Sequence, residues 1–175
     1  ASSLSAIHLA ALELTTGRAD MVLTGGVDAF NDIFMFMCFS KTQALSPTGE
    51  ARPFAANADG TILGEGVGMV VLKRLEDARR DGDRVLAILK GIGSSSDGRS
   101  QSIYAPRAEG QAQALRRAYE VSAVSPATVE LVEAHGTGTR VGDAVEFEAL
   151  RTVYSEARQH DTPWCALGLS LIHIS

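Results

Sequence analysis

The chain has 175 residues, of which 45% are hydrophobic and 21% are charged, a composition typical of a folded globular protein rather than a disordered or fibrous one. Its formal net charge of −5 provides no basic face, so nucleic acid is not an expected partner. No apolar run reaches the roughly 20 residues that a membrane span needs, and no signal-peptide pattern opens the chain. We expect a cytoplasmic protein with one hydrophobic core.

The sequence predicts no metal site and no directly bound cofactor. Cys38 and Cys165 lie far apart and belong to no CxxC or Cys/His pattern, so we expect each to be a buried structural thiol. Two glycine-containing segments fail as cofactor motifs. A strand follows residues 64–68 where a dinucleotide fingerprint requires a helix, and residues 57–60 lack the first and twelfth ligands of a calcium loop.

The first elements predict a helix and then a strand. Ser2 or Ser3 can cap a helix that ends near Gly17, and its apolar residues surround more than half of its circumference, so we expect burial on several sides. Residues 19–24 predict a short buried strand that stops at Gly25-Gly26. This order begins an alternation of βαβ type.

Residues 28–40 concentrate four of the six phenylalanines within ten residues. The segment is either core, or a lid packed on the core, or else the wall of an apolar acyl tunnel or a subunit interface. A long loop over 41–59 follows. A loop of that length in a compact domain is usually functional or packed over a site.

The remaining elements continue to alternate, which implies a layered α/β fold. We expect strands over 67–72, 84–92 and 129–132, and helices over 74–81, from Pro106 onward and over 141–154. In the helix after Pro106, Ala112, Leu115, Ala118 and Tyr119 share the apolar face. Ser125-Pro126 reads as a cap followed by proline at the first helical position.

Residues 133–139 read Glu-Ala-His-Gly-Thr-Gly-Thr and follow a predicted strand. His135 therefore lies where a strand ends, a place where a side chain can enter a crevice while the framework stays rigid. The two glycines allow a ligand to approach the backbone, and the hydroxyls of Thr137 and Thr139 can donate and accept hydrogen bonds. The alternative is a tight turn that contains one solvated histidine.

Several motifs in a fixed order resemble the β-ketoacyl synthase (ketosynthase) family. They are residues 1–10, Thr-Gly-Gly-Val-Asp at 24–28, Phe39-Ser40, Ala44 to Pro47, Asp59-Gly60, Gly64-Glu-Gly66, 71–75, Asp97-Gly-Arg99, and Glu133 to Thr139 with Gly142-Asp143 and Glu146. Residues 95–98 and 102–111 are most similar to iterative synthases of polyunsaturated fatty acids or enediyne-type polyenes.

The resemblance implies a thiolase-like layered α/β/α/β/α fold, incomplete here, and a homodimer. The implied reaction is the decarboxylative condensation of an acyl group on a cysteine with a malonyl thioester on the phosphopantetheine arm of an acyl carrier protein. His135 would donate a hydrogen bond to the enolate oxygen. Thr137 and Thr139 would bind the amides of the arm.

The sequence also departs from the family pattern. The family's nucleophilic cysteine stands immediately before the residue aligned with Ala1, so neither Cys38 nor Cys165 corresponds to it. Leu171 stands at the position of a family lysine, a second family histidine would follow Ser175, and His173 is out of register. Ala55 stands where the family usually has an aspartate.

We therefore expect a partial ketosynthase domain over 1–168 and a tail over 169–175 that does not match the family and is a possible truncation artefact. Such a fragment should be inactive and poorly stable alone, because lost strands would uncover sheet edges and apolar faces. Two alternatives stay open. One is a non-catalytic ketosynthase-like subunit that dimerises or sets chain length, and the other is a thiolase-type acyltransferase that uses coenzyme A.

Overall fold

The computed structural model describes residues 2–98, 105–158 and 162–170. The chain forms two compact units: Ala1–Cys38 with Leu63–Leu89, and Phe39–Ile62 with Lys90–Ser175. The family positions assigned to Ala1, Arg99, Leu171 and His173, and residues 102–104 of the segment 102–111, lie outside the described residues. Within the described part, no helix is long and apolar enough to cross a membrane.

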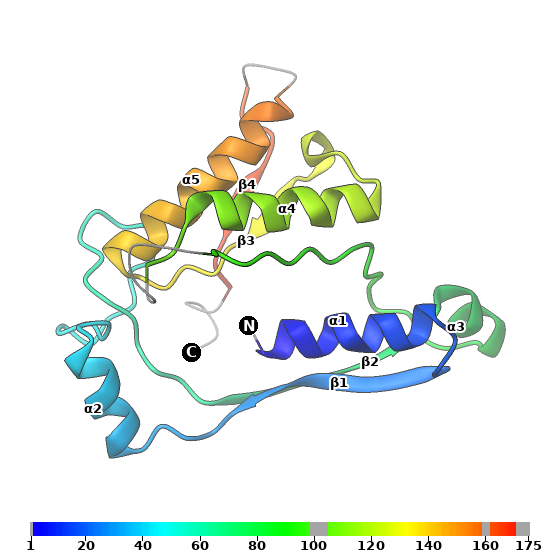
Figure 1. The fold of residues 1–175 in the computed structure, drawn as a ribbon, viewed down its shortest axis with the longest axis horizontal. Coiled ribbons are helices and arrows are strands. Elements are labelled where there is room, and N and C mark those ends of the chain that lie inside the picture. The colour runs from blue at the N-terminus through cyan, green and yellow to red at the C-terminus, as the bar shows by residue number, and fades with distance from the viewer. Residues whose placement is uncertain (1, 99–104, 159–161, 171–175) are drawn as a thin grey trace. The chain divides into compact units, whose positions relative to one another are not determined.

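A two-stranded sheet organises the first unit (Figure 1). Strand β1 (Met21–Asp28) pairs with β2 (Gly66–Lys73) in antiparallel register, from Met21 opposite Lys73 to Asp28 opposite Gly66. The strand predicted over 67–72 is thereby confirmed. The expectation of a βαβ unit at this point is wrong, because the two strands run in opposite directions.

The glycines of β1 lie inside the strand, so the prediction that they stop it is wrong. A Cβ on Gly25 would lie 2.0 Å from the carbonyl oxygen of Gly68. A Cβ on Gly26 would lie 2.7 Å from the Cβ of Ser3. The two glycines therefore allow close packing against the neighbouring strand and helix.

Helix α1 (Ser2–Thr15) lies along the sheet and ends before Gly17, whose φ of 71° confirms the predicted termination. The expected burial on several sides is wrong. Only Ala10 and Leu14 are buried, whereas Leu4 and Leu9 are each 64% exposed. Only β1 and β2 make substantial contact with this helix among the described elements, and they cover one of its faces.

Arg74 connects three elements of the first unit. Its Nη1 donates to the carbonyl oxygens of Leu14 at 2.9 Å and Ala19 at 2.7 Å, and its Nε donates to Asp77 at 2.5 Å. The end of α1 and the turn before β1 are thus connected to helix α3 (Leu75–Asp81). This short helix closes at Gly82 in the left-handed conformation, as predicted.

Two expectations for apolar segments fail because both segments are exposed. The phenylalanine-rich run forms helix α2 (Ile33–Lys41), which buries none of its residues, so it is not core in the described chain. Residues 84–92 form no strand, since no described segment pairs with them, and Leu86 is 81% exposed. The alternatives of an acyl tunnel wall or a subunit interface for α2 stay predictions.

The second unit contains a βαβ crossover. Strand β3 (Leu131–Glu133) is followed by helix α5 (Arg140–Glu156) and strand β4 (Ala166–Gly168), and the two strands are parallel. The first strand was expected over 129–132 and mostly buried. It begins two residues later, and Leu131 is 62% exposed.

Two helices form the core of this unit. Helix α4 (Ala108–Ser122) lies beside α5, which confirms both predicted helices (Figure 1). Their interface buries Ala112, Ala149 and Val153, with Leu115 and Tyr119 packed against them. The short 3₁₀-helix η1 (Pro126–Thr128) precedes β3, and the Ser125 side chain accepts a hydrogen bond from the Ala127 N–H, as the Ser-Pro pair predicts.

Candidate active-site loop

Residues 134–139, here called the His loop, connect the end of β3 to the start of α5. The loop turns twice through the left-handed region, at Gly136 with a φ of 52° and at Gly138 with a φ of 74°. A Cβ on Gly138 would also lie 2.7 Å from the carbonyl oxygen of Gly60. Glycine is therefore required at 138 both by backbone conformation and by space.

Glu146 fixes the backbone at the candidate catalytic residue. Its Oε1 accepts a hydrogen bond from the His135 N–H at 2.6 Å, and its Oε2 accepts one from the Gly136 N–H at 2.9 Å. Bonds from N–H groups to a carboxylate are among the stronger hydrogen bonds in proteins. They hold the path of the loop at His135 relative to the second turn of α5.

Asp143 fixes the other half of the loop. Its Oδ1 accepts from the Gly138 N–H at 3.0 Å, and its Oδ2 accepts from the Phe54 N–H at 2.7 Å. The residue is 5% exposed, so both bonds are shielded from water. As an acidic residue in the first turn of α5, its charge is also favoured by the dipole of that helix.

The two threonines form a hydrogen-bonded pair. The Oγ1 atoms of Thr137 and Thr139 lie 2.9 Å apart, and Thr137 Oγ1 also accepts from the Thr139 N–H at 3.3 Å. Thr139 is the N-cap of α5, because its hydroxyl accepts from the Gly142 N–H at 3.1 Å. The structure thus brings together both residues expected to bind the carrier arm.

The imidazole of His135 forms no hydrogen bond within the described residues, and His135 is an exposed residue. Its backbone is held while both ring nitrogens stay available to a ligand. A rigid backbone with an uncommitted ring suits a group that must donate a hydrogen bond to a reacting atom.

The loop between α2 and β2, which was predicted over 41–59 and also contains Gly60, packs against the His loop and the first residue of α5. The Gly60 N–H donates to the Gly138 carbonyl at 3.0 Å, and Arg140 Nε donates to the Ala58 carbonyl at 3.1 Å. Within this loop, Asp59 accepts from the hydroxyls of Ser46 at 2.6 Å and Thr48 at 2.8 Å. These bonds, that of Ser46 foremost, lower the pKa of Asp59 and keep it charged.

Neither cysteine belongs to the His loop. Cys38 is exposed on α2, so the expectation of a buried thiol is wrong there, and Cys165 is half-buried. Burial raises the pKa of the Cys165 thiol, which disfavours the thiolate that a nucleophile needs.

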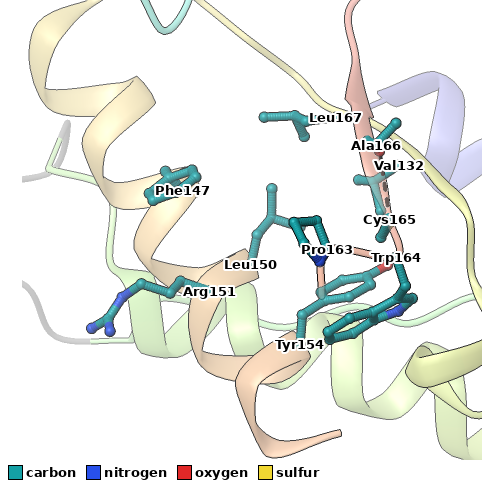
Figure 2. A pocket seen from close by; sticks show the side chains of 10 residues that line it. All are labelled: Val132, Phe147, Leu150, Arg151, Tyr154, Pro163, Trp164, Cys165, Ala166 and Leu167. Carbon is teal, nitrogen blue, oxygen red and sulfur yellow. Dashed lines mark hydrogen bonds between the residues drawn. The ribbon is translucent and has the colours of Figure 1, made fainter. Parts of the chain in front are cut away.

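Cys165 instead lines an apolar pocket of about 220 Å³ between α5 and the strands β3 and β4 (Figure 2). Tyr154 lies in the same pocket, where burial and a hydrogen bond with Tyr119 raise its pKa. Trp164 packs beside Tyr154, with ring centroids 6.4 Å apart. The pocket is lined mainly by apolar and aromatic side chains, apart from Arg151, so it offers no second set of reactive groups.

The roles of Asp143 and Glu146 are not evident from the motif alone. They bind three backbone N–H groups that lie five to eleven residues away and a fourth, that of Phe54, that lies 89 residues away, and no spacing rule specifies these contacts. The sequence feature that could have indicated these roles is the spacing of Asp143 and Glu146, two acidic residues three positions apart at the start of a helix that follows a glycine-rich loop.

Solved structures place the chain in a fold class. It matches a ketosynthase from module 6 of the bacillaene synthase of Bacillus subtilis 168 with a TM-score of 0.94 and 39% identity, over 99% of this chain and 31% of that chain. It matches the PfaC ketosynthase–chain length factor protein with a TM-score of 0.90 and 40% identity, over 96% of this chain and 18% of that chain. The fold is the thiolase-like α/β fold of ketosynthase domains, present in part.

The sequence narrows this class to one family. Residues 1–78 match the N-terminal domain of β-ketoacyl synthases, and residues 86–168 match their C-terminal domain. The chain belongs to the β-ketoacyl synthase family.

Curated relatives are large synthases. The chain is 48% identical over 167 residues to a phenolphthiocerol/phthiocerol polyketide synthase of Mycobacterium tuberculosis, covering 95% of this chain and 9% of that protein. It is 49% identical over 157 residues to a polyunsaturated fatty acid synthase of Thraustochytrium, covering 90% of this chain and 6% of that protein. The chain thus spans under a tenth of these relatives, and their similar identities leave the subfamily a prediction.

Proposed function

We propose that the chain is part of a β-ketoacyl-[acyl-carrier-protein] synthase that performs a decarboxylative Claisen condensation in polyketide or fatty acid biosynthesis. The observation that carries the proposal is the geometry of the His loop. Glu146 and Asp143 bind the backbone N–H groups of the loop while the His135 imidazole forms no bond to the described protein.

His135 has a defined role in this reaction. Loss of carbon dioxide from the malonyl thioester leaves an enolate, and its carbon attacks the acyl thioester while the cysteine thiolate departs. The negative charge on the enolate oxygen needs a donor already in place, because a preorganised donor stabilises charge without reorganisation. The uncommitted ring of His135 can supply that donor.

Thr137 and Thr139 are proposed to bind the amides of the phosphopantetheine arm. A hydroxyl has one proton and two lone pairs. Thr139 already accepts from the Gly142 N–H and shares one bond with Thr137. Whichever of the two hydroxyls donates in that shared bond, Thr139 keeps one unused proton or lone pair for an amide.

The nucleophile is proposed to be a cysteine immediately before the residue aligned with Ala1. Cys38 is exposed and has no place in the His loop, and the raised pKa of Cys165 opposes thiolate formation. The proposed partners are an acyl carrier protein and a second copy of the parent protein. The proposed reaction needs no cofactor other than the phosphopantetheine arm of the carrier protein.

The test is a condensation assay on the full synthase with acyl and malonyl carrier proteins. Replacing His135 by Ala should lower kcat by about 10²- to 10³-fold, the usual cost of removing one donor to a developing oxyanion. His8→Ala is the matched control, because His8 lies in α1 outside the His loop and should retain activity. Full activity of His135→Ala would contradict the proposal.

A second candidate function is that of a non-catalytic subunit with the same fold. The similarity to a ketosynthase–chain length factor protein supports this candidate. The residue before Ala1 in the encoded protein distinguishes the two candidates. A residue other than cysteine there excludes covalent catalysis.

A further inference from the structure

The loop between α2 and β2 is closed at its base by two sequence motifs, residues 44–47 and 59–60, that have no role in the proposed reaction. The Ser46 N–H donates to the Thr61 carbonyl at 2.9 Å, and the Thr61 N–H donates to the Ala44 carbonyl at 2.8 Å. These bonds form a single parallel bridge, and all of these residues belong to the second unit. The two ends of the loop are therefore held side by side.

The side chain of Asp59 reinforces this closure. Its Oδ1 accepts a hydrogen bond from the Ser46 hydroxyl at 2.6 Å, and its Oδ2 accepts one from the Thr48 hydroxyl at 2.8 Å. The two hydroxyl oxygens lie 3.0 Å apart, and Arg52 Nη1 lies 3.8 Å from Asp59 Oδ2. The Asp59 side chain is only 17% exposed, so these charge-assisted bonds are partly shielded from water.

Gly60, the residue after Asp59, packs between Ser46 and the His loop. A Cβ on Gly60 would lie 2.4 Å from the Ser46 nitrogen. On its other side, the Gly60 N–H donates to the Gly138 carbonyl at 3.0 Å, and a Cβ on Gly138 would lie 2.7 Å from the Gly60 carbonyl oxygen. Gly138 separates Thr137 from Thr139, here called the threonine pair. A displacement at Ser46 therefore reaches the backbone of that pair.

We propose that Asp59 is a positioning residue for the threonine pair: it fixes Gly60, and Gly60 fixes the backbone at Gly138. His135 is held separately, because Glu146 accepts a hydrogen bond from its N–H. Loss of the Asp59 carboxylate should therefore disturb the threonine pair more than the histidine. The coupling between the two loops rests on the contacts above, whereas its effect on catalysis rests on the proposed function.

Hydrogen exchange of the full protein, measured by mass spectrometry, tests the coupling without reference to activity. Asp59→Ala should speed exchange in residues 137–142 about tenfold, the effect of losing one hydrogen bond of ordinary strength. Glu50→Ala is the matched control, because it removes the same charge from the same loop, and its exposed carboxylate binds Arg52. It should leave this exchange unchanged. Unchanged exchange in Asp59→Ala, or an equal increase in helix α4, would overturn the proposal.

A second set of variants tests the route through the hydroxyls. The Ser46→Ala/Thr48→Ala double variant should exchange as Asp59→Ala does, and adding Asp59→Ala to it should change nothing further, because all three side chains act as one unit. Asp59→Asn keeps one acceptor oxygen and should be intermediate. Additive effects of the hydroxyl and carboxylate substitutions would overturn this route.

Condensation kinetics of the full synthase test the consequence for the reaction. Asp59→Ala should raise KM for the malonyl carrier protein about tenfold and change kcat less than about threefold, because the disturbed groups bind substrate and the enolate donor stays in place. A fall in kcat with an unchanged KM would overturn the assignment to the threonine pair. If the unaltered synthase forms no product, the proposed function fails, and the exchange experiment still decides whether Asp59 positions the loop.

Discussion

Asp143 and Glu146 act on the backbone of the His loop, and each carboxylate binds two N–H groups with its two oxygens. The bond from the Gly138 N–H is buried, and a buried N–H group that loses its acceptor is costly because it has given up its hydrogen bonds to water. Glu146 therefore fixes the backbone of the His loop at His135, and Asp143 fixes it at Gly138.

The structure predicts that Asp143→Ala destabilises the protein by about 2–6 kcal/mol, since two N–H groups would each lose a carboxylate acceptor at about 1–3 kcal/mol per group. Urea unfolding of the full protein, rather than of the isolated chain, measures the change. Glu148→Ala is the matched control, because Glu148 lies on the same helix in an exposed pair with Arg151. A loss for Asp143→Ala no larger than that of the control would contradict this role.

At the scale of elements, the loops around the site depend on glycine in two different ways. Gly138 and Gly82 both have a φ of 74°. A Cβ on Gly138 would meet the Gly60 carbonyl at 2.7 Å, whereas a Cβ on Gly82 meets nothing within 4 Å. A comparison of Ala substitutions at Gly82 and Gly138 therefore distinguishes the cost of backbone strain, which both would have, from the cost of a steric clash, which only Gly138 would have.

Gly82→Ala should therefore cost about 1–2 kcal/mol, the penalty of an L-residue in the left-handed conformation. Gly138→Ala should cost more and should also lower condensation activity, because the His loop must move away from the loop that contains Gly60. Thermal unfolding and kcat, measured on both variants, test this. Equal losses of stability with unchanged activity in both would show that the contact at Gly60 is unimportant.

Local signals predicted α1, α3, α4 and α5 but not α2, which the sequence analysis treated only as an apolar segment. The strands were predicted less well, because they depend on contacts between distant parts of the chain. Gly82 and Thr139 mark helix ends through interactions within a few residues, so the sequence alone indicates α3 and α5. A strand requires a partner from elsewhere in the chain, and the apolar segment 84–92 has none in the described part. The predicted burial of α1 on several sides was wrong for the same reason, because among the described elements only β1 and β2 cover this helix.

For the candidate site, the motif predicts side chains, whose roles stay predictions, but it does not predict the contacts made by the loop backbone. His135, Thr137 and Thr139 follow from the motif, and the structure places the two threonines in contact. The bonds from Glu146 to two N–H groups and the contact between Gly60 and Gly138 depend on the tertiary path of the chain. No pattern of residue types encodes them.

At the scale of the whole molecule, stability should depend on acid pH. Hydrogen bonds from Arg80, and then from Lys73, lower the pKa of Asp81 from 3.8 to about 2. Because the folded pKa is below the unfolded value, the stabilisation is present above about pH 4 and is lost as the pH falls toward 2. The free energy of unfolding in urea should fall over this window, and Lys73→Gln should reduce the fall.

These pairs are solvent-exposed, so the effect should be small and should weaken further at high salt. If Lys73→Gln does not change how stability depends on acid pH, the dependence comes from carboxylates other than Asp81.

Large apolar side chains are exposed in both units, among them Phe34 at 67%, Met69 and Phe147. Patches of this kind bind other apolar surfaces or aggregate. We expect the isolated chain to bind a hydrophobic dye and to lack a cooperative, high-temperature unfolding transition. A sharp transition at high temperature without dye binding would contradict this expectation.

Asp143 and Glu146, whose carboxylates bind the His loop, belong to the first two turns of α5. A change in the orientation of this helix would therefore move the backbone at His135. That orientation is set at the other end of the helix, where Ala149 and Val153 pack against α4. Val153 lies ten residues beyond Asp143, about 15 Å along the helix axis. A change of side-chain volume at Val153 can therefore alter the orientation of the His135 imidazole from a position outside the His loop.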